Sequence, residues 1–218
     1  MGNTDNKFVG FLKKTGSNAA KGLKGFSVNL LKFLIIFIGA CALLYFVSLM
    51  PDNVIAGTTI PVFFSAVTIV CAMLTCTAVT GKMFGAAIMS FVLPFISYFL
   101  NPLFSPVFIA VHIFSDFMMI FLYNLIRFQK ENYLTLAIPI VIGGLARYGL
   151  LALFCKMGEK FIEYIMIFKN VTDEQGLAQA VEQMKVESLH GQLIATILGV
   201  VAAYGFVALF KLVQSKKK

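Results

Sequence analysis

Long stretches without a charged residue dominate the chain. Four of them are long enough to cross a bilayer, and they cover residues 33–51, 53–81, 83–115 and 188–210. A membrane-spanning helix needs about 20 consecutive, mainly apolar residues, so the second and third stretches have room for more than one helix, or for a helix and a loop. The pattern predicts an all-α integral membrane protein.

Turn-forming and polar residues divide these stretches into six predicted spans. Pro51-Asp52-Asn53 ends the first span, and the pair Asn101-Pro102 is a turn signal inside the third stretch. The polar segment 127–132 separates the fourth span from the fifth. The predicted spans cover residues 33–50, 58–78, 83–100, 103–126, 133–154 and 189–210.

Polar segments outside the spans define the remaining parts of the chain. Residues 1–26 form a basic cytoplasmic tail and residues 214–218 a second basic tail, on either side of a six-helix membrane domain at 27–213. The long connection 156–188 precedes the last span, and its part 158–168 has the spacing of an amphipathic helix. We expect that helix to lie on the extracytoplasmic membrane surface or to cap the bundle.

The charge distribution predicts the topology. The net charge is +8, but the positive charges follow a membrane pattern and not a nucleic-acid-binding surface. If the N-terminus is inside, thirteen Lys and Arg residues lie on the inner side, whereas the outer segments hold four together with seven acidic residues. Basic residues are retained on the cytoplasmic side. The sequence therefore predicts a multi-pass protein of the inner (cytoplasmic) membrane, with both termini cytoplasmic.

Charged residues within the spans are rare. Asp116 lies 11 residues before Arg127, and Arg147 lies 14 residues after Tyr133. At 1.5 Å per residue these are depths of about 16 and about 21 Å from the cytoplasmic side, within reach of two long side chains. Because a charge in the bilayer is costly without a partner, we expect Asp116 and Arg147 to pair or to share one polar pocket. A buried ion pair that only fixes helix register is an equally plausible reading.

Other polar residues extend this region toward the outer side. His112 lies one helical turn from Asp116, and Asn101 and Ser105 continue the same face. At the start of the last span, His190, Gln192 and Thr196 would lie at the outer rim, where free helix N–H groups bind anions or are simply capped. His112 and Asp116 offer a metal only two ligands, so no metal site is predicted.

Two further patterns bear on packing and chemistry. Ala195, Gly199 and Ala203 recur every four residues, a spacing that lets two membrane helices approach closely. The chain contains no HExxH, G-x-S-x-G, P-loop or GxGxxG motif. We therefore predict no enzymatic activity and no cofactor.

Several segments resemble the substrate-binding S component of energy-coupling factor (ECF) transporters. The similarity spans residues 83–213 and rests on three segments: Leu93-Pro94 through Asn101-Pro102 to Pro106, Gly143-Gly144 through Arg147 to Gly149, and Gly191-Gln192 through Thr196 to Gly199. The family's first span usually has an Ala-x-x-x-Ala pattern that faces the coupling subunit. Here the first span has only Gly39-Ala40-Cys41-Ala42.

The resemblance implies a function. Such a protein would bind a small vitamin-like solute at the outer face and work with a transmembrane coupling subunit and cytoplasmic ATPases, with the loops 51–57 and 156–188 as lids. The implied solute site consists of Asn101, Ser105, His112, Asp116, Arg147, Tyr148, His190, Gln192 and Thr196. The charge of the solute is open, because Asp116 suits a cation and Arg147 an anion. The alternative is an oligomeric channel or a structural membrane protein without a small-molecule site.

Overall fold

The computed structural model describes residues 27–55, 57–81, 83–101, 106–127, 141–150, 153 and 186–215. Nearly all of this part is helical. Its elements are an N-terminal helix Ser27–Ser48, strands β1 (Val54–Ile55) and β2 (Thr58–Thr59), helices α2 (Ile60–Thr80), α3 (Met83–Leu100) and α4 (Pro106–Arg127), a helical segment 141–150, and α8 (Val186–Ser215).

Four of these helices are long and apolar enough to cross a membrane. They are Ser27–Ser48, Ile60–Thr80, Met83–Leu100 and the part His190–Val213 of α8. Ile109–Leu125 of α4 is a shorter apolar helix. The protein is therefore an α-helical multi-pass membrane protein. The count of six spans and the cytoplasmic position of both ends stay predictions.

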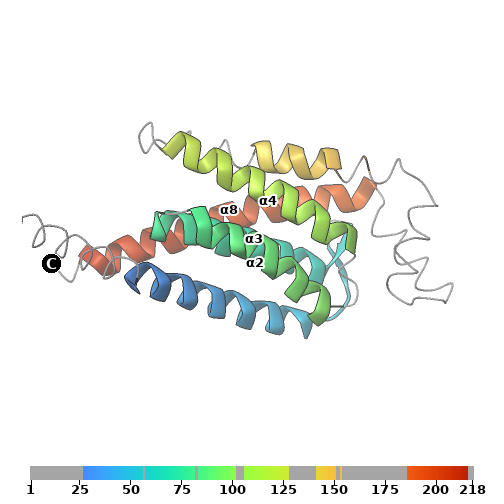
Figure 1. The fold of residues 1–218 in the computed structure, drawn as a ribbon. Coiled ribbons are helices and arrows are strands. Elements are labelled where there is room, and N and C mark those ends of the chain that lie inside the picture. The colour runs from blue at the N-terminus through green and yellow to red at the C-terminus, as the bar shows by residue number, and fades with distance from the viewer. Residues whose placement is uncertain are drawn as a thin grey trace, which may run out of the picture.

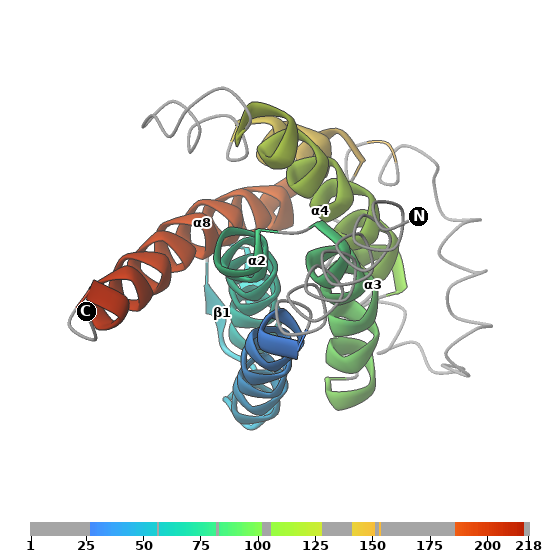
Figure 2. The ribbon, with the colours of Figure 1, turned by 60° about the vertical axis from the view of Figure 1, so that its left-hand side comes forward.

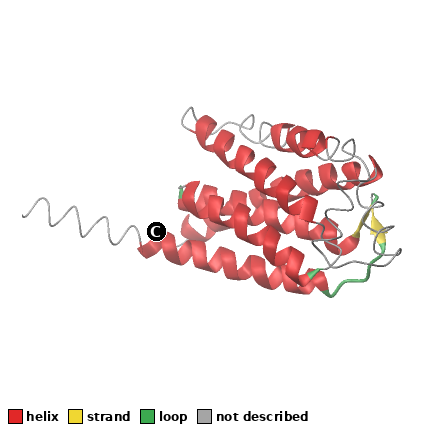
Figure 3. Cartoon of the chain, turned by 45° about the vertical axis from the view of Figure 1, so that its right-hand side comes forward, coloured by secondary structure: helices red, strands yellow, loops and turns green. Residues whose placement is uncertain are grey.

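A β-hairpin precedes α2. Strands β1 and β2 pair antiparallel, with Val54 opposite Thr59 and Ile55 opposite Thr58. Gly57, in the turn, has a φ of 78°, which a residue without a Cβ adopts at little cost. The sequence predicted a loop at 51–57 and a span beginning at residue 58, whereas the helix begins two residues later because Thr58 and Thr59 form β2. The hairpin lies at one end of the bundle (Figure 3), which we call the hairpin end.

Helix α2 forms the centre of the bundle. It packs against α8, α3 and α4, and in Figure 2 these helices and the blue N-terminal helix surround it. In its most apolar stretch 67% of the residues are buried, against 17% in the N-terminal helix. Its C-terminus is closed by Gly81, whose φ is 70° and whose N–H donates to the Thr77 carbonyl at 3.0 Å.

Two helices extend further than the sequence predicted, in both cases past a lysine. The N-terminal helix begins at Ser27 and not at residue 33, because Lys32 lies within it: its Nζ donates to the Val79 carbonyl at 3.3 Å and lies 5.7 Å from the ring centroid of Phe210. Helix α8 continues past Lys211 to Ser215, beyond the predicted end of the last span at residue 210. A lysine at a membrane boundary can extend toward polar surroundings without ending a helix.

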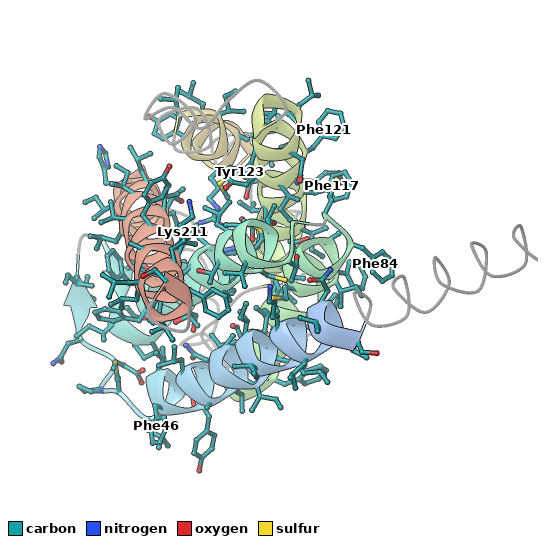
Figure 4. The ribbon with its side chains drawn as sticks, turned by 90° about the vertical axis from the view of Figure 1, so that its left-hand side faces the viewer. Phe46, Phe84, Phe117, Phe121, Tyr123 and Lys211 are labelled. Carbon is teal, nitrogen blue, oxygen red and sulfur yellow. The ribbon has the colours of Figure 1, made fainter. Side chains whose placement is uncertain are left out.

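Large apolar side chains cover the outside of the bundle. Phe46, Phe84, Phe117 and Phe121 extend outward (Figure 4), and Phe84 is 76% exposed. The buried core contains mainly aliphatic and methionine side chains from several helices, among them Ile69, Met73, Met89, Leu93 and Ile120. An apolar surface around a packed core is expected where the surroundings are lipid tails.

Several predicted features lie outside the described residues. They are the basic tail 1–26, the turn residue Ser105, the amphipathic stretch 158–168 and the ends of the predicted fifth span, of which 141–150 is described.

Candidate functional site

Three helical segments bring a set of buried polar side chains together. Helix α4 contributes His112, Ser115 and Asp116, the segment 141–150 contributes Arg147, and α8 contributes Thr196. We call these five residues the polar network. Each is at most 1% exposed. Figure 1 shows α4, the yellow segment 141–150 and α8 as neighbours along one side of the bundle.

Two glycines set the position of the arginine. A Cβ at Gly143 would collide with the side chain of Met119 in α4, and a Cβ at Gly144 would lie 2.7 Å from Cδ1 of Leu193 in α8. A larger residue at either position would therefore require the side chain of Met119 or Leu193 to shift. Arg147 follows about one turn later, so its side chain begins between the two helices that supply its partners.

All three nitrogens of the Arg147 guanidinium bond to other side chains. Nε donates to Ser115 Oγ at 2.9 Å, and Nη1 donates to Thr196 Oγ1 at 2.8 Å. Nη2 donates to Asp116 Oδ1 and forms an ion pair with that carboxylate. The predicted pairing of Asp116 with Arg147 is thus confirmed. The interaction joins residues 31 positions apart in the sequence.

His112 completes the network as a hydrogen-bond acceptor. Its Nδ1 lies 2.8 Å from Arg147 Nη2 and 3.2 Å from Asp116 Oδ2. A guanidinium nitrogen can only donate, so Nδ1 accepts from Arg147, and the imidazole proton resides on Nε2. In that state His112 is neutral. The network then holds one positive and one negative charge, which compensate each other.

This compensation explains how the bundle tolerates charge. A carboxylate or guanidinium in the bilayer is expensive alone and acceptable when paired and hydrogen-bonded. Thr196 links the pair to its own helix, because its hydroxyl accepts from Arg147 and donates to the Gln192 carbonyl at 2.8 Å. The ion pair is thereby fixed to α4, to 141–150 and to α8 at once.

The other predicted site residues divide into buried and exposed ones. Asn101, at the end of α3, and Gln192, in α8, are buried at 5% and 2% exposure. Tyr148 is 43% exposed, because the residue after Arg147 is turned by about 100° around the helix. His190 is also exposed. Tyr148 and His190 thus differ from the five residues of the polar network, all of which are buried.

Ser115 belongs to the network, although the sequence analysis did not select it. It accepts from Arg147 and lies between two predicted site residues on the same helix. Its spacing from His112 is three residues, which places both on one helix face. That spacing was the signal that could have identified it.

Helices α2 and α8 lie side by side in the same direction, which aligns their polar residues. Ala195 packs with Phe63 and Ala66 of α2, and a Cβ at Gly199 would lie 2.7 Å from Val70 Cβ. Gln192 lies about one turn before Ala195 in α8. Thr58 lies in β2, directly before α2. Strand β2 contacts α8, which agrees with this alignment.

Unsatisfied polar atoms gather at this hairpin end. Within the described part of the chain, Gln192 Nε2, Thr58 Oγ1, Thr59 Oγ1 and Ser97 Oγ are buried at this end without a hydrogen-bond partner, and Thr75 Oγ1 is another such atom toward the other end of α2. Ser97 lies one turn before the end of α3, and α3 runs opposite to α2 (Figure 1), so Ser97 belongs to the same end. Buried polar atoms normally have partners, so unsatisfied ones call for an explanation.

No metal centre is evident among the residues that the structure describes. They contain no group of three or more His, Cys, Asp or Glu side chains that could hold an ion. Comparison of the chain with protein-family models, with curated proteins and with solved structures finds no match. The site is therefore interpreted from its own residues.

Proposed function

We propose that this protein is a membrane-embedded binding subunit for a small polar solute, which binds at the hairpin end of the bundle. The polar network would form the floor of the site, and Gln192, Thr58 and Ser97 would contact the solute. In this proposal Asn101, which is buried at the same end, also lines the solute site.

The observation that carries the proposal is the buried carboxamide of Gln192. Its Nε2 has no partner within the described residues, although the side chain is 2% exposed. A buried donor without an acceptor costs about 1–3 kcal/mol. A solute that supplies the acceptor would recover that cost, which gives the solute a specific advantage at this position.

The resemblance to ECF S components supplies the wider proposal. We propose that the solute is vitamin-like, that the hairpin end faces outward from the cytoplasmic membrane, and that a transmembrane coupling subunit with cytoplasmic ATPases drives uptake. The excess of basic residues on the predicted inner side supports this orientation. A tagged chain should then co-purify with an ATPase pair from its native membrane.

Mass spectrometry of the purified protein tests the binding role. Protein isolated in mild detergent should release a small solute on denaturation, and vitamins, nucleobases and amines should be screened for a rise in Tm. Gln192→Leu should abolish the response. The matched control is Leu198→Ala, which alters an exposed apolar position of the same helix and should respond as wild type does.

A second function is favoured by one observation. Every nitrogen of Arg147 is bonded within the protein, as expected for a pair that only fixes the register of three helices. That arrangement suits a channel or a structural membrane protein. It predicts symmetric oligomers in detergent and ion flux in liposomes. A monodisperse monomer that releases a bound solute would rule it out.

A further inference from the structure

We infer that the solute is uncharged and is held by neutral hydrogen-bonding groups, a conclusion that rests on the proposed binding function. The sequence left the charge of the solute open, because Asp116 suits a cation and Arg147 an anion. Some polar groups of the site already have hydrogen-bond or ion-pair partners within the protein, and others have none. This difference indicates which solute the site can bind.

The charged groups of the site are already committed to each other. The Arg147 guanidinium donates to Ser115, to Thr196 and to the Asp116 carboxylate, and His112 accepts from the same guanidinium. An anionic solute that took Arg147 would leave Asp116 buried without its counter-charge. A cationic solute that took Asp116 would leave Arg147 in the same position. Breaking a buried pair in this way is strongly unfavourable.

The unsatisfied groups at the hairpin end are all neutral. Among the described residues they are one carboxamide, of Gln192, and three hydroxyls, of Thr58, Thr59 and Ser97. Lys32 and Lys211, two charged residues of the described chain, lie toward the opposite end, where Lys32 contacts the last turn of α2 and Phe210. Asp52 lies near the hairpin but is exposed.

These groups define a complementary solute. The Gln192 amide nitrogen requires an acceptor, such as a carbonyl oxygen or an unprotonated ring nitrogen. Each hydroxyl accepts one further hydrogen bond and donates one, so it matches an N–H, an O–H or a second carbonyl. A charged solute in the same place would lose its hydration without gaining an opposite charge from any buried side chain that the structure describes there. A neutral heterocycle with carbonyl or amide substituents meets all of these conditions.

Charge-sorted fractions of a growth-medium extract test the inference. A complex medium extract is passed over cation- and anion-exchange resins to give cationic, anionic and neutral fractions, and each is added to the purified full chain. We expect the neutral fraction to raise Tm by about 5 °C or more at saturation. The charged fractions should leave Tm unchanged.

Two variants connect the response to the proposed contacts. Gln192→Leu removes the amide donor at similar volume, and Ser97→Ala removes one hydroxyl at a separate helix. Each should lose most of the shift given by the neutral fraction, whereas Leu198→Ala should keep it. If Gln192→Leu does not fold, the thermal shift of Ser97→Ala alone tests the proposed contacts. A full shift retained in both variants would overturn the inference.

The outcomes separate the inference from the function on which it depends. A shift given only by the anionic or the cationic fraction overturns the neutral solute and leaves the binding function in place. No shift with any fraction, together with no co-purified solute, overturns the binding function itself. A neutral-fraction shift that the variants lose supports both.

Discussion

Helix α8 is held by two interfaces that work in opposite ways. Toward α2 it presents small residues, and Gly199 approaches so closely that a Cβ there would lie 2.7 Å from Val70 Cβ. Toward 141–150 and α4 it presents Thr196, which binds a buried arginine. The first interface depends on shape alone and the second on charge.

The difference teaches what each kind of contact can specify. Lipid tails are as apolar as the side chains of a helix, so close packing gives affinity but little directional information. A guanidinium with four separate acceptors on two neighbouring helices restricts the rotation and the height of each helix. The charged interface thus defines register, and the small-residue interface defines distance.

The largest effect is expected from breaking the ion pair on one side only. Asp116→Leu leaves the Arg147 guanidinium buried without its counter-charge, so the free energy of unfolding should fall by about 3–5 kcal/mol. The double variant Asp116→Leu with Arg147→Met should recover most of that loss. Unfolding by SDS in mixed micelles, followed by far-UV circular dichroism because the chain has no Trp, measures both. Equal losses in the single and double variants would show that the charges do not act as a pair.

An intermediate effect is expected at the small-residue interface. Gly199→Ala forces a methyl group against Val70 and the Val67 carbonyl, so it should cost about 1–3 kcal/mol of unfolding free energy. Gly205→Ala is the control, because nothing lies within 4 Å of its added Cβ. That control should be neutral or should stabilise by up to about 1 kcal/mol through helix propensity. A similar cost at both glycines would contradict the close approach.

A smaller effect is expected from removing one acceptor of the guanidinium. Thr196→Val keeps the volume but deletes the hydroxyl that accepts from Nη1 and donates to the Gln192 carbonyl. Hydrogen bonds between membrane helices contribute about 0.6 kcal/mol on average and at most about 1.7. Thr196→Ser should retain most of the stability. The same unfolding assay compares the two, and a deficit in Thr196→Ser as large as in Thr196→Val would show that the methyl group matters instead.

The smallest effect on the free energy of unfolding is expected from removing the charge of Lys32, which lies at the boundary of the bundle. Lys32→Met removes a hydrogen bond to the Val79 carbonyl and a contact with the Phe210 ring, which together should be worth about 0.5–1 kcal/mol. Because the lysine is only half-buried, salt should weaken its contribution. A salt-independent loss of several kcal/mol would place Lys32 with the buried charges rather than with the boundary ones.

Some of the fold could be predicted because the chain marks it clearly. The third span matches α3 at both ends, Met83 and Leu100, since a glycine-lysine pair precedes it and Asn101-Pro102 follows it. The hairpin could not be predicted, because its strands have two residues each and no alternating pattern fits into so short a segment. The early start of the first helix was missed because Lys32 was interpreted as a boundary.

The candidate site also contains residues that the sequence could predict and residues that it could not. The pair of Asp116 and Arg147 was predictable from depth, since two lone charges at similar heights on antiparallel neighbours have few other partners. Thr58 and Ser97 were not, because one hydroxyl in an apolar stretch looks like any other until tertiary packing shows which are satisfied. Tyr148 was selected by its position in a motif, and the helical turn from Arg147 carries it to the outside.

The length of α8 has a consequence for the surroundings of the protein. Its apolar part has 24 residues, which at 1.5 Å each gives about 36 Å, and it diverges from α2 toward its C-terminus (Figure 2). A hydrocarbon layer is about 30 Å thick, so a helix of this length fits only by leaning. We therefore expect the thickness of the bilayer to influence the angle between α8 and α2.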